Sequence, residues 1–309
     1  MKAPTIHTPA APLEASYQPA TKIAELSATA PISEILEILD RDGGLILTDL
    51  VSTADLSSIA TETKPHYDNK PKHTVAIIPQ QTVLLGGLVG KSPTAAKICE
   101  HHVLKALRDT ILVDRFDIRN EEVTSKALTV EPLLSVSLTF NIGPGAPRQR
   151  LHRDDQIWGT KHARPFVLHQ QEQLACLVAA SDVRRENGAT MFVPGSHRWD
   201  DEREPRLDEI CFAEMKPGSA LIFLASAYHG GGHNALPDFI RTVHGFFFCR
   251  GTLRTEENQF LAIPRSVAMG MSEEMLSLLG YKKPGTTLGV VESVDPMSDL
   301  QGCLLKANA

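Results

Sequence analysis

The chain has 309 residues, of which 42% are hydrophobic and 22% charged, and this composition excludes an intrinsically disordered protein and indicates a globular fold with a large core. Its formal net charge of -6, from 31 Lys and Arg against 37 Asp and Glu, gives no electrostatic reason to expect nucleic acid as a partner. Five scattered cysteines without C-x-x-C spacing indicate neither a disulfide framework nor a zinc knuckle.

The beginning of the chain is rich in Pro, Ala and Thr and contains no apolar run. We therefore expect neither a signal peptide nor membrane insertion, and a cytoplasmic location. Residues 1–30 lack periodicity and are expected to form a flexible arm. Residues 31–309 are expected to form a single domain: helix-rich over 31–124, a β core over about 125–255, and a C-terminal helical or lid segment over about 256–309.

The first elements in chain order are helical. Apolar residues at helical spacing predict a helix over residues 32–39, with Ser33 as candidate N-cap. The Asp-Gly-Gly sequence at 42–44 ends it, and a short buried strand at 45–47 and a second helix near Ser52 should follow. Ser92 and Pro93 have the residue types of an N-cap and a first helical position, so they predict a further helix that continues to about residue 107.

From about residue 125 the pattern changes to period two. Leu134, Val136, Leu138 and Phe140 alternate with small polar residues, as in a half-buried strand. Further strands are predicted at 173–180, 189–193, 219–225 and 242–249, separated by Gly, Pro and Asn signals. Many short strands at close spacing favour a mainly β fold, a cupin-like double-stranded β-helix (jelly roll) with the helices of the N-terminal third packed on its outside.

Three residues have the types and spacing of a metal site. In the sequence His152-Arg153-Asp154, residues two apart on a strand share a face, so His152 and Asp154 can reach one ion while Arg153 points away. His229 is the candidate third ligand. Two His and one carboxylate form the facial triad of non-heme Fe(II) oxygenases, which leaves coordination positions open for a co-substrate and O₂.

Two neighbours compete with these ligands. Asp155 adjoins Asp154, but its side chain should point to the opposite face and form a solvated or supporting carboxylate. His233 follows His229 in a Gly-rich turn, and we expect its ring to fix the loop by hydrogen bonds.

Three sequence runs in the same order resemble the phytanoyl-CoA dioxygenase family, and in particular fungal dioxygenases that tailor meroterpenoids and alkaloids. They are the runs at 143–154, 186–197 and 229–234. The resemblance implies an enzyme that binds Fe(II) through His152, Asp154 and His229, with 2-oxoglutarate as co-substrate and O₂ as oxidant. Oxidation of an unactivated C–H bond would then release succinate and CO₂.

The resemblance also implies which residues bind 2-oxoglutarate. Arg241 stands twelve residues after His229, as in the family, and its planar guanidinium can bind the distal carboxylate bidentately. Gln149 and Thr190 match family positions that hydrogen-bond the oxo-acid. Several relatives carry a basic residue where this chain has Leu84, so either Gln81 or Thr82 replaces that contact or it is absent.

The expected substrate is a hydrophobic small molecule, such as a fungal natural product. Trp158 and Phe140 are candidate cavity residues, with Phe166 and Phe248 as further apolar candidates, although each is equally suited to core packing. Hydroxylation, desaturation, rearrangement and endoperoxidation all remain open. Relatives often complete the active site with a partner's C-terminal segment, here residues 255–300, so a homodimer is expected. A cupin-like metal enzyme or isomerase without 2-oxoglutarate and a non-catalytic scaffold are the alternatives.

Overall fold

The protein is mainly β, as predicted. The computed structural model describes residues 10–68, 73–118, 126–162, 165–282 and 287–307. A seven-stranded sheet has the order β1-β2-β10-β7-β12-β6-β3, and a three-stranded sheet has the order β11-β8-β9. The strands of the large sheet are β1 Glu25–Ser27, β2 Gly44–Thr48, β3 Thr82–Gly86, β6 Leu133–Ile142, β7 Gln173–Ala179, β10 Ala220–Leu224 and β12 Arg241–Cys249. Those of the small sheet are β8 Thr190–Phe192, β9 Cys211–Ala213 and β11 His229–Gly230.

Alternation along the central strands divides the interior into two cores. On β7, Leu174, Cys176 and Val178 belong to the cluster that contains the helices. The residues between them, Ala175, Leu177 and Ala179, belong to a second cluster that also contains residues of both sheets. A strand buried on both faces is a nearly continuous apolar run, as β7 is. One face of the large sheet is therefore free to meet the small sheet and enclose a site.

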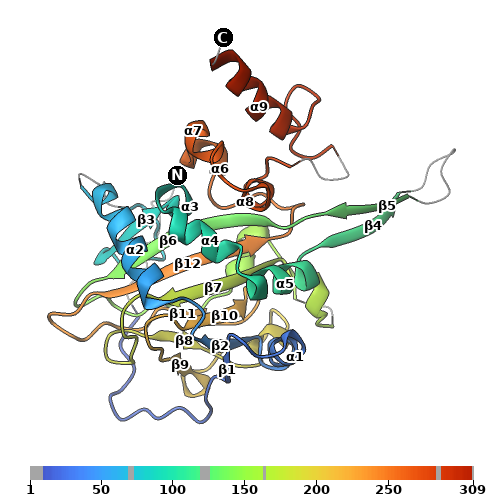
Figure 1. Ribbon diagram of the computed structural model, residues 1–309. Coiled ribbons are helices and arrows are strands. Elements are labelled where there is room, and N and C mark those ends of the chain that lie inside the picture. Colours follow the sequence, from blue (N-terminus) through green and yellow to red (C-terminus); the bar gives the residue numbers. More distant parts are fainter. Residues whose placement is uncertain (1–9, 69–72, 119–125, 163–164, 283–286, 308–309) are drawn as a thin grey trace, which may run out of the picture.

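The helices of the front third pack against the large sheet (Figure 1). They are α1 Ile32–Asp42, α2 Thr53–Thr63, α3 Leu88–Lys91, α4 Pro93–Cys99 and α5 His102–Ile111. Ser92 is an N-cap, as predicted, and Ser52 caps the helix predicted near it; each accepts a backbone hydrogen bond. The prediction of Ser33 as N-cap was wrong, because α1 begins at Ile32 behind Pro31 and Ser33 is its second residue. The helix predicted from Pro93 to about residue 107 is two helices, divided after Cys99.

Strand β6 contains a bulge that the alternation did not reveal. Phe247 and Phe248 of β12 pair with Val136 and Leu134, so Ser135 is the extra residue between them. Leu134 therefore packs in the helix-side core, whereas Val136 lines the opposite face. A bulge bends the strand and changes the direction of the side chain at the irregularity. The prediction that Leu134 and Val136 share a face was wrong for this reason.

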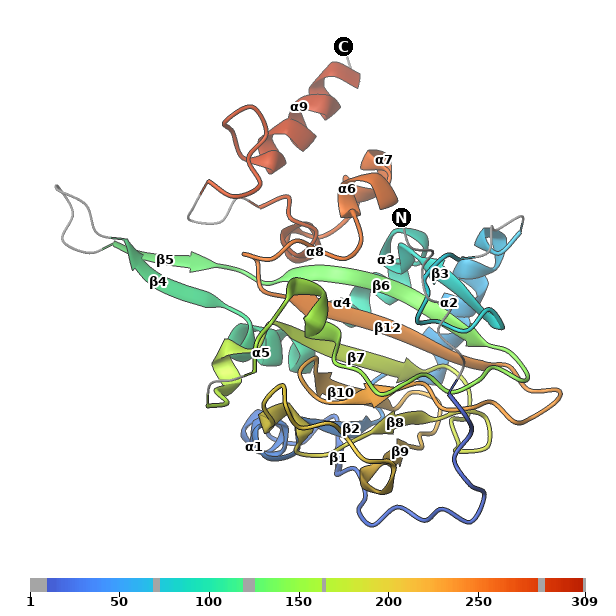
Figure 2. The ribbon, with the colours of Figure 1, turned by 180° about the vertical axis from the view of Figure 1, so that it is seen from behind.

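The N-terminal segment packs against the two sheets, whereas a hairpin in the middle of the chain and the last helix extend away from them. Within the stretch expected as an arm, β1 pairs with β2, and the Tyr17 hydroxyl donates to the Ile210 carbonyl at 2.6 Å; residues 1–9 lie outside the described residues. A hairpin of β4 Asp114–Ile118 and β5 Lys126–Val130 projects from the body, as does the last helix (Figure 2). The C-terminal helices are α6 Gln259–Ala262, α7 Arg265–Ala268, α8 Glu273–Leu278 and α9 Pro296–Ala307. No helix among the described residues is long and apolar enough to span a membrane.

Candidate active site

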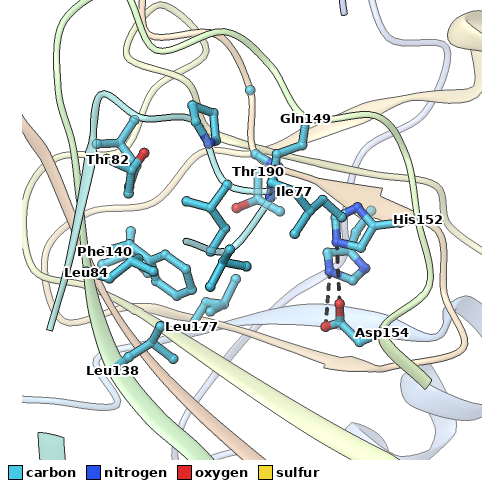
Figure 3. A pocket seen from close by; sticks show the side chains of 18 of the residues that line it. Ile77, Thr82, Leu84, Leu138, Phe140, Gln149, His152, Asp154, Leu177 and Thr190 are labelled. Atoms are coloured by element: carbon cyan, nitrogen blue, oxygen red, sulfur yellow. Dashed lines mark hydrogen bonds and ion pairs between the residues drawn. The ribbon is translucent and has the colours of Figure 1, made fainter. Parts of the chain in front are cut away.

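The three predicted metal ligands converge at one end of a cavity between the sheets (Figure 3). One nitrogen or oxygen atom from each of His152, Asp154 and His229 lies within 4.8 Å of the other two. The Nε2 atoms of His152 and His229 lie 3.4 and 3.3 Å from the two carboxylate oxygens of Asp154. This arrangement can hold one ion on a single face, with the remaining positions directed into the cavity.

Backbone contacts fix the orientation of both imidazoles. His152 and His229 exchange a pair of backbone hydrogen bonds of 2.9 and 3.0 Å, which brings residues far apart in sequence side by side. Each ring has its Nδ1 near the carbonyl two residues earlier, at 2.8 Å from Arg150 and 3.0 Å from Ala227. A ring that donates through Nδ1 keeps Nε2 unprotonated, which is the form that binds a metal.

The electrostatics of the three groups favour a bound cation. Burial opposes ionisation of Asp154, but the His229 and His152 rings outweigh burial and hold the Asp154 pKa below its ordinary value. Burial likewise lowers the pKa of His229, but Asp154 outweighs it and raises the pKa overall. The carboxylate is therefore ionised and electrostatically suited to a metal ion placed between the rings.

Arg241 is a buried cation directed to the same cavity. It begins β12, is only 3% exposed, and lines the cavity. Its Nε has no hydrogen-bond partner, and no carboxylate of the described residues pairs with it. Burial lowers its pKa from 12.5 to about 10. An unpaired buried guanidinium is destabilising on its own, so the site fits an anionic ligand such as the distal carboxylate of an oxo-acid.

Gln149 and Thr190 also line the cavity, as do Thr82 and Leu84, whereas Gln81 does not. The side-chain amide of Gln149 donates to the Ile77 carbonyl at 3.2 Å, and its backbone N–H donates to the Gly231 carbonyl at 2.8 Å. Thr82 and Leu84 lie two apart on β3 and so share its inner face. Of the three residues considered for the contact that relatives make through a basic side chain, only Thr82 brings a polar group to the cavity.

Residues 39–243 match the profile of the family described as phytanoyl-CoA dioxygenase (PhyH). The chain belongs to the phytanoyl-CoA dioxygenase family. It is 50% identical over 302 residues to a protein named dioxygenase swnH1 from Arthroderma benhamiae, with 96% of this chain and 98% of that protein covered. It is 30% identical over 298 residues to dioxygenase cnsJ from Penicillium expansum, with 91% and 89% covered. Like its family, it is a non-heme iron enzyme that uses 2-oxoglutarate and O₂.

Solved structures confirm the predicted jelly roll. HygX from Streptomyces hygroscopicus, solved with nickel and 2-oxoglutarate bound, is similar with a TM-score of 0.54 at 16% identity, over 73% of this chain and 90% of that one. The carbocyclase SnoK of nogalamycin biosynthesis, described as α-ketoglutarate dependent, has a TM-score of 0.52 at 14% identity, over 74% and 87%. These likenesses concern the fold.

Apart from Glu256, the rest of the cavity lining of this dioxygenase is mainly apolar. Its volume is about 360 Å³. Figure 3 shows His152 and Asp154 at one end and Leu84, Leu138 and Phe140 at the other. Phe140 thus lies where it was predicted. Apolar side chains from the large sheet and the 75–79 segment complete the wall, among them Val75, Ile77, Ile78, Val136, Ile142, Leu177, Phe223, Val243 and Phe247.

Three of the aromatic residues considered for this wall lie elsewhere. Trp158 ends the 3-10 helix Asp154–Trp158, and its indole N–H donates to the Arg254 carbonyl at 2.9 Å instead of entering the cavity. Phe248 packs in the helix-side core, because side chains alternate along β12 and Arg241 and Phe247 occupy the cavity face. Phe166 stacks edge-on against the His197 ring. For Phe166 and Phe248 the core-packing alternative therefore holds, and Trp158 does not line the cavity.

A supporting network that the sequence analysis missed lies behind Asp154. His162 has its Nε2 3.0 Å from Asp155 and its Nδ1 2.7 Å from Asp201. Burial lowers its pKa, but the two carboxylates outweigh burial and raise it. Asp155 is buried rather than solvated, and so is Arg153, which donates to the carbonyls of Ser196 and Trp199, each at 2.9 Å. His233 holds its loop as expected, with Nδ1 2.9 Å from the Ala146 carbonyl.

Proposed function

We propose that His152, Asp154 and His229 are the Fe(II) ligands of this enzyme and that Arg241 binds the distal carboxylate of 2-oxoglutarate. The observation that carries the proposal is the convergence of two imidazole nitrogens and a carboxylate in a cavity that also contains a buried guanidinium without a partner. Gln149 and Thr190 are proposed as hydrogen-bond partners of the oxo-acid, because both line the same cavity.

Bound iron and 2-oxoglutarate supply the activation of O₂ that oxidises a C–H bond, with release of succinate and CO₂. The protein orients the metal ligands and the reactants and excludes water from the site. The paired backbones of residues 152 and 229 fix the two rings. The apolar wall around Leu138 and Phe140 excludes water from the end of the cavity opposite the ligands.

We infer that the substrate is a hydrophobic small molecule, such as a fungal natural product. The apolar cavity lining and its volume of about 360 Å³ support this inference, as does the similarity to fungal dioxygenases. Hydroxylation, desaturation, rearrangement and endoperoxidation are all outcomes that the site allows. We also propose a cytoplasmic homodimer whose residues 31–309 form one domain.

The test is an anaerobic titration of the metal-free protein with Fe(II) and then 2-oxoglutarate, followed by the visible charge-transfer band of the chelated keto acid. We expect the band in the parent and in H233A, and its loss in H152A and D154A, with circular dichroism unchanged in all four. H233A is the matched control, because His233 is the neighbouring imidazole that holds a loop. A band that survived in D154A would refute the ligand assignment. Iron binding without a band in the parent would favour a cupin-like enzyme that does not use 2-oxoglutarate.

A further inference from the structure

Glu256 is a carboxylate in the cavity that the proposed function does not use. It lines the cavity of the metal ligands and also an adjoining cavity of about 470 Å³ under the C-terminal segment. Glu256 is exposed to solvent, so a ligand in either cavity can reach it. Of the charged side chains that line the first cavity, Asp154 and Arg241 are assigned to the metal and the oxo-acid, and Glu256 is the third.

Two neutral donors fix the position of this carboxylate. Oε1 of Glu256 accepts hydrogen bonds from the Ser135 hydroxyl at 3.1 Å and from the Gln173 side-chain amide at 2.7 Å. The Glu256 backbone N–H donates in turn to the Ser135 hydroxyl at 3.1 Å. Ser135 is the extra residue of the β6 bulge, and bulges often redirect a side chain next to an active site. Within the described chain, Oε2 accepts no hydrogen bond and remains available.

No cation of the described chain compensates Glu256. It forms no ion pair with a Lys, Arg or His side chain; Lys282, which lines the adjoining cavity, pairs with Glu131 instead. Burial raises the Glu256 pKa, and the carboxylates of Asp154 and Glu257 raise it further. A carboxylate held at a fixed position in a cavity without a counter-charge attracts a ligand that brings one.

The sum of charges in the site with Fe(II) and 2-oxoglutarate bound also favours a cationic ligand at Glu256. With the two His ligands neutral, the charges of Fe(II), Asp154, 2-oxoglutarate and Arg241 cancel one another. Glu256 then carries the one uncompensated charge of the described cavity lining. A substrate with a single positive charge would make the complete complex neutral, whereas an anionic substrate would be repelled.

We propose that Glu256 is a specificity-determining residue that binds a protonated amine of the substrate through Oε2 and so directs a neighbouring C–H bond to the metal. The proposal rests on the proposed function, because it takes the metal and the oxo-acid as bound. The substrate class it defines is a compact, mainly hydrocarbon amine that is charged at neutral pH.

The test compares three probes of the same shape and different charge: adamantylamine, adamantanol and adamantanecarboxylate. Their binding to the anaerobic enzyme loaded with Fe(II) and 2-oxoglutarate is measured by calorimetry. We expect the amine to bind more tightly than the alcohol by about tenfold or more, and the carboxylate to bind most weakly. In E256Q, which keeps the shape and the acceptor of both hydrogen bonds, amine and alcohol should bind alike while the charge-transfer band is unchanged. E131Q is the matched control, because it removes one carboxylate that faces only the adjoining cavity, and it should keep the preference.

The outcomes separate the two proposals. A normal charge-transfer band together with equal binding of amine and alcohol in the parent would overturn the assignment of Glu256 and leave the dioxygenase site intact. A preference for the amine that survived in E256Q would do the same. Absence of the band in the parent would refute the proposed function and with it the charge balance on which the amine assignment depends.

Discussion

Replacing Arg241 by Met should have opposite effects on folding and on co-substrate binding. Met is close in volume to Arg and carries no charge, so R241M removes a buried cation that has no partner in the protein. Replacement of a buried charge by an apolar side chain of similar size is often stabilising. The same substitution removes the group that we assign to the distal carboxylate of 2-oxoglutarate.

The magnitude follows from burial. The pKa of Arg241 falls from 12.5 to about 10, and each pKa unit corresponds to about 1.4 kcal/mol. At every pH below about 10 the charged form is therefore disfavoured in the folded protein by about 3 kcal/mol, an upper estimate of what R241M can add to the free energy of unfolding. Loss of a buried, charge-assisted contact costs about 2 to 5 kcal/mol. The dissociation constant of 2-oxoglutarate should thus rise by about thirtyfold to several thousandfold.

Chemical denaturation of the cofactor-free protein and anaerobic titration of the Fe(II)-loaded protein with 2-oxoglutarate measure the two effects. R150M is the matched control, since Arg150 is an exposed arginine close to His152 in sequence, and it should change neither quantity much. A 2-oxoglutarate affinity in R241M equal to that of the parent would refute the role of Arg241. A cofactor-free R241M less stable than the parent would refute the argument from an unpaired buried charge.

Two further predictions concern stability. Burial lowers the pKa of His244 from 6.5 to about 4. Between these two pH values the unfolded chain binds a proton on this imidazole that the folded protein does not bind. The free energy of unfolding should therefore fall as pH decreases through this range, by up to about 3 kcal/mol for His244. Urea unfolding between pH about 7 and about 4 should show a shallower pH dependence in H244Q than in the parent, and an unchanged slope would contradict the reasoning. Gly188 has φ +87°, and an added Cβ would lie 2.7 Å from the Gly232 carbonyl oxygen. G188A should therefore lower the free energy of unfolding by about 1 to 3 kcal/mol. It should also weaken 2-oxoglutarate binding, because Gly232 lines the cavity. G145A is its control, with φ +72° but no atom within 4 Å of the added Cβ, and an equal loss in both variants would show that the contact with Gly232 does not matter.

Much of the fold follows from periodicity alone. The strands predicted at 173–180 and 242–249 are observed as Gln173–Ala179 and Arg241–Cys249. In both strands the side chains point alternately into the two hydrophobic cores. The cluster of His152, Asp154 and His229 was also predictable, since two of its members lie on one short segment and the third lies in a Gly-rich motif. The β6 bulge had no such signal, because it arises from pairing with β12 and not from any residue near Ser135.

Glu256 shows what local sequence cannot predict. Its neighbours Ser135 and Gln173 lie 121 and 83 residues away in the chain, and only the return of the segment after β12 along β6 brings them together. Trp158 illustrates the converse. Its proximity to Asp154 in sequence suggested the cavity, but the 3-10 helix between them turns the indole toward Arg254. Side-chain direction after the last regular residue of a strand depends on the turn that follows.

Arg241, which we propose binds the distal carboxylate of 2-oxoglutarate, stands at the start of β12. Arg241 is paired with Ile142 of β6, and Val243 is paired on both sides, with Phe140 and Ala179. The backbone of Arg241 cannot move toward His152 and His229 without disrupting the pairing of β12 with β6 and β7. If Arg241 binds the distal carboxylate of 2-oxoglutarate, as we propose, an oxo-acid shorter by one methylene, such as oxaloacetate, should chelate the metal but not reach Arg241 with its distal carboxylate. We therefore expect the enzyme to select its co-substrate by length, because strand pairing holds the backbone of Arg241 in place.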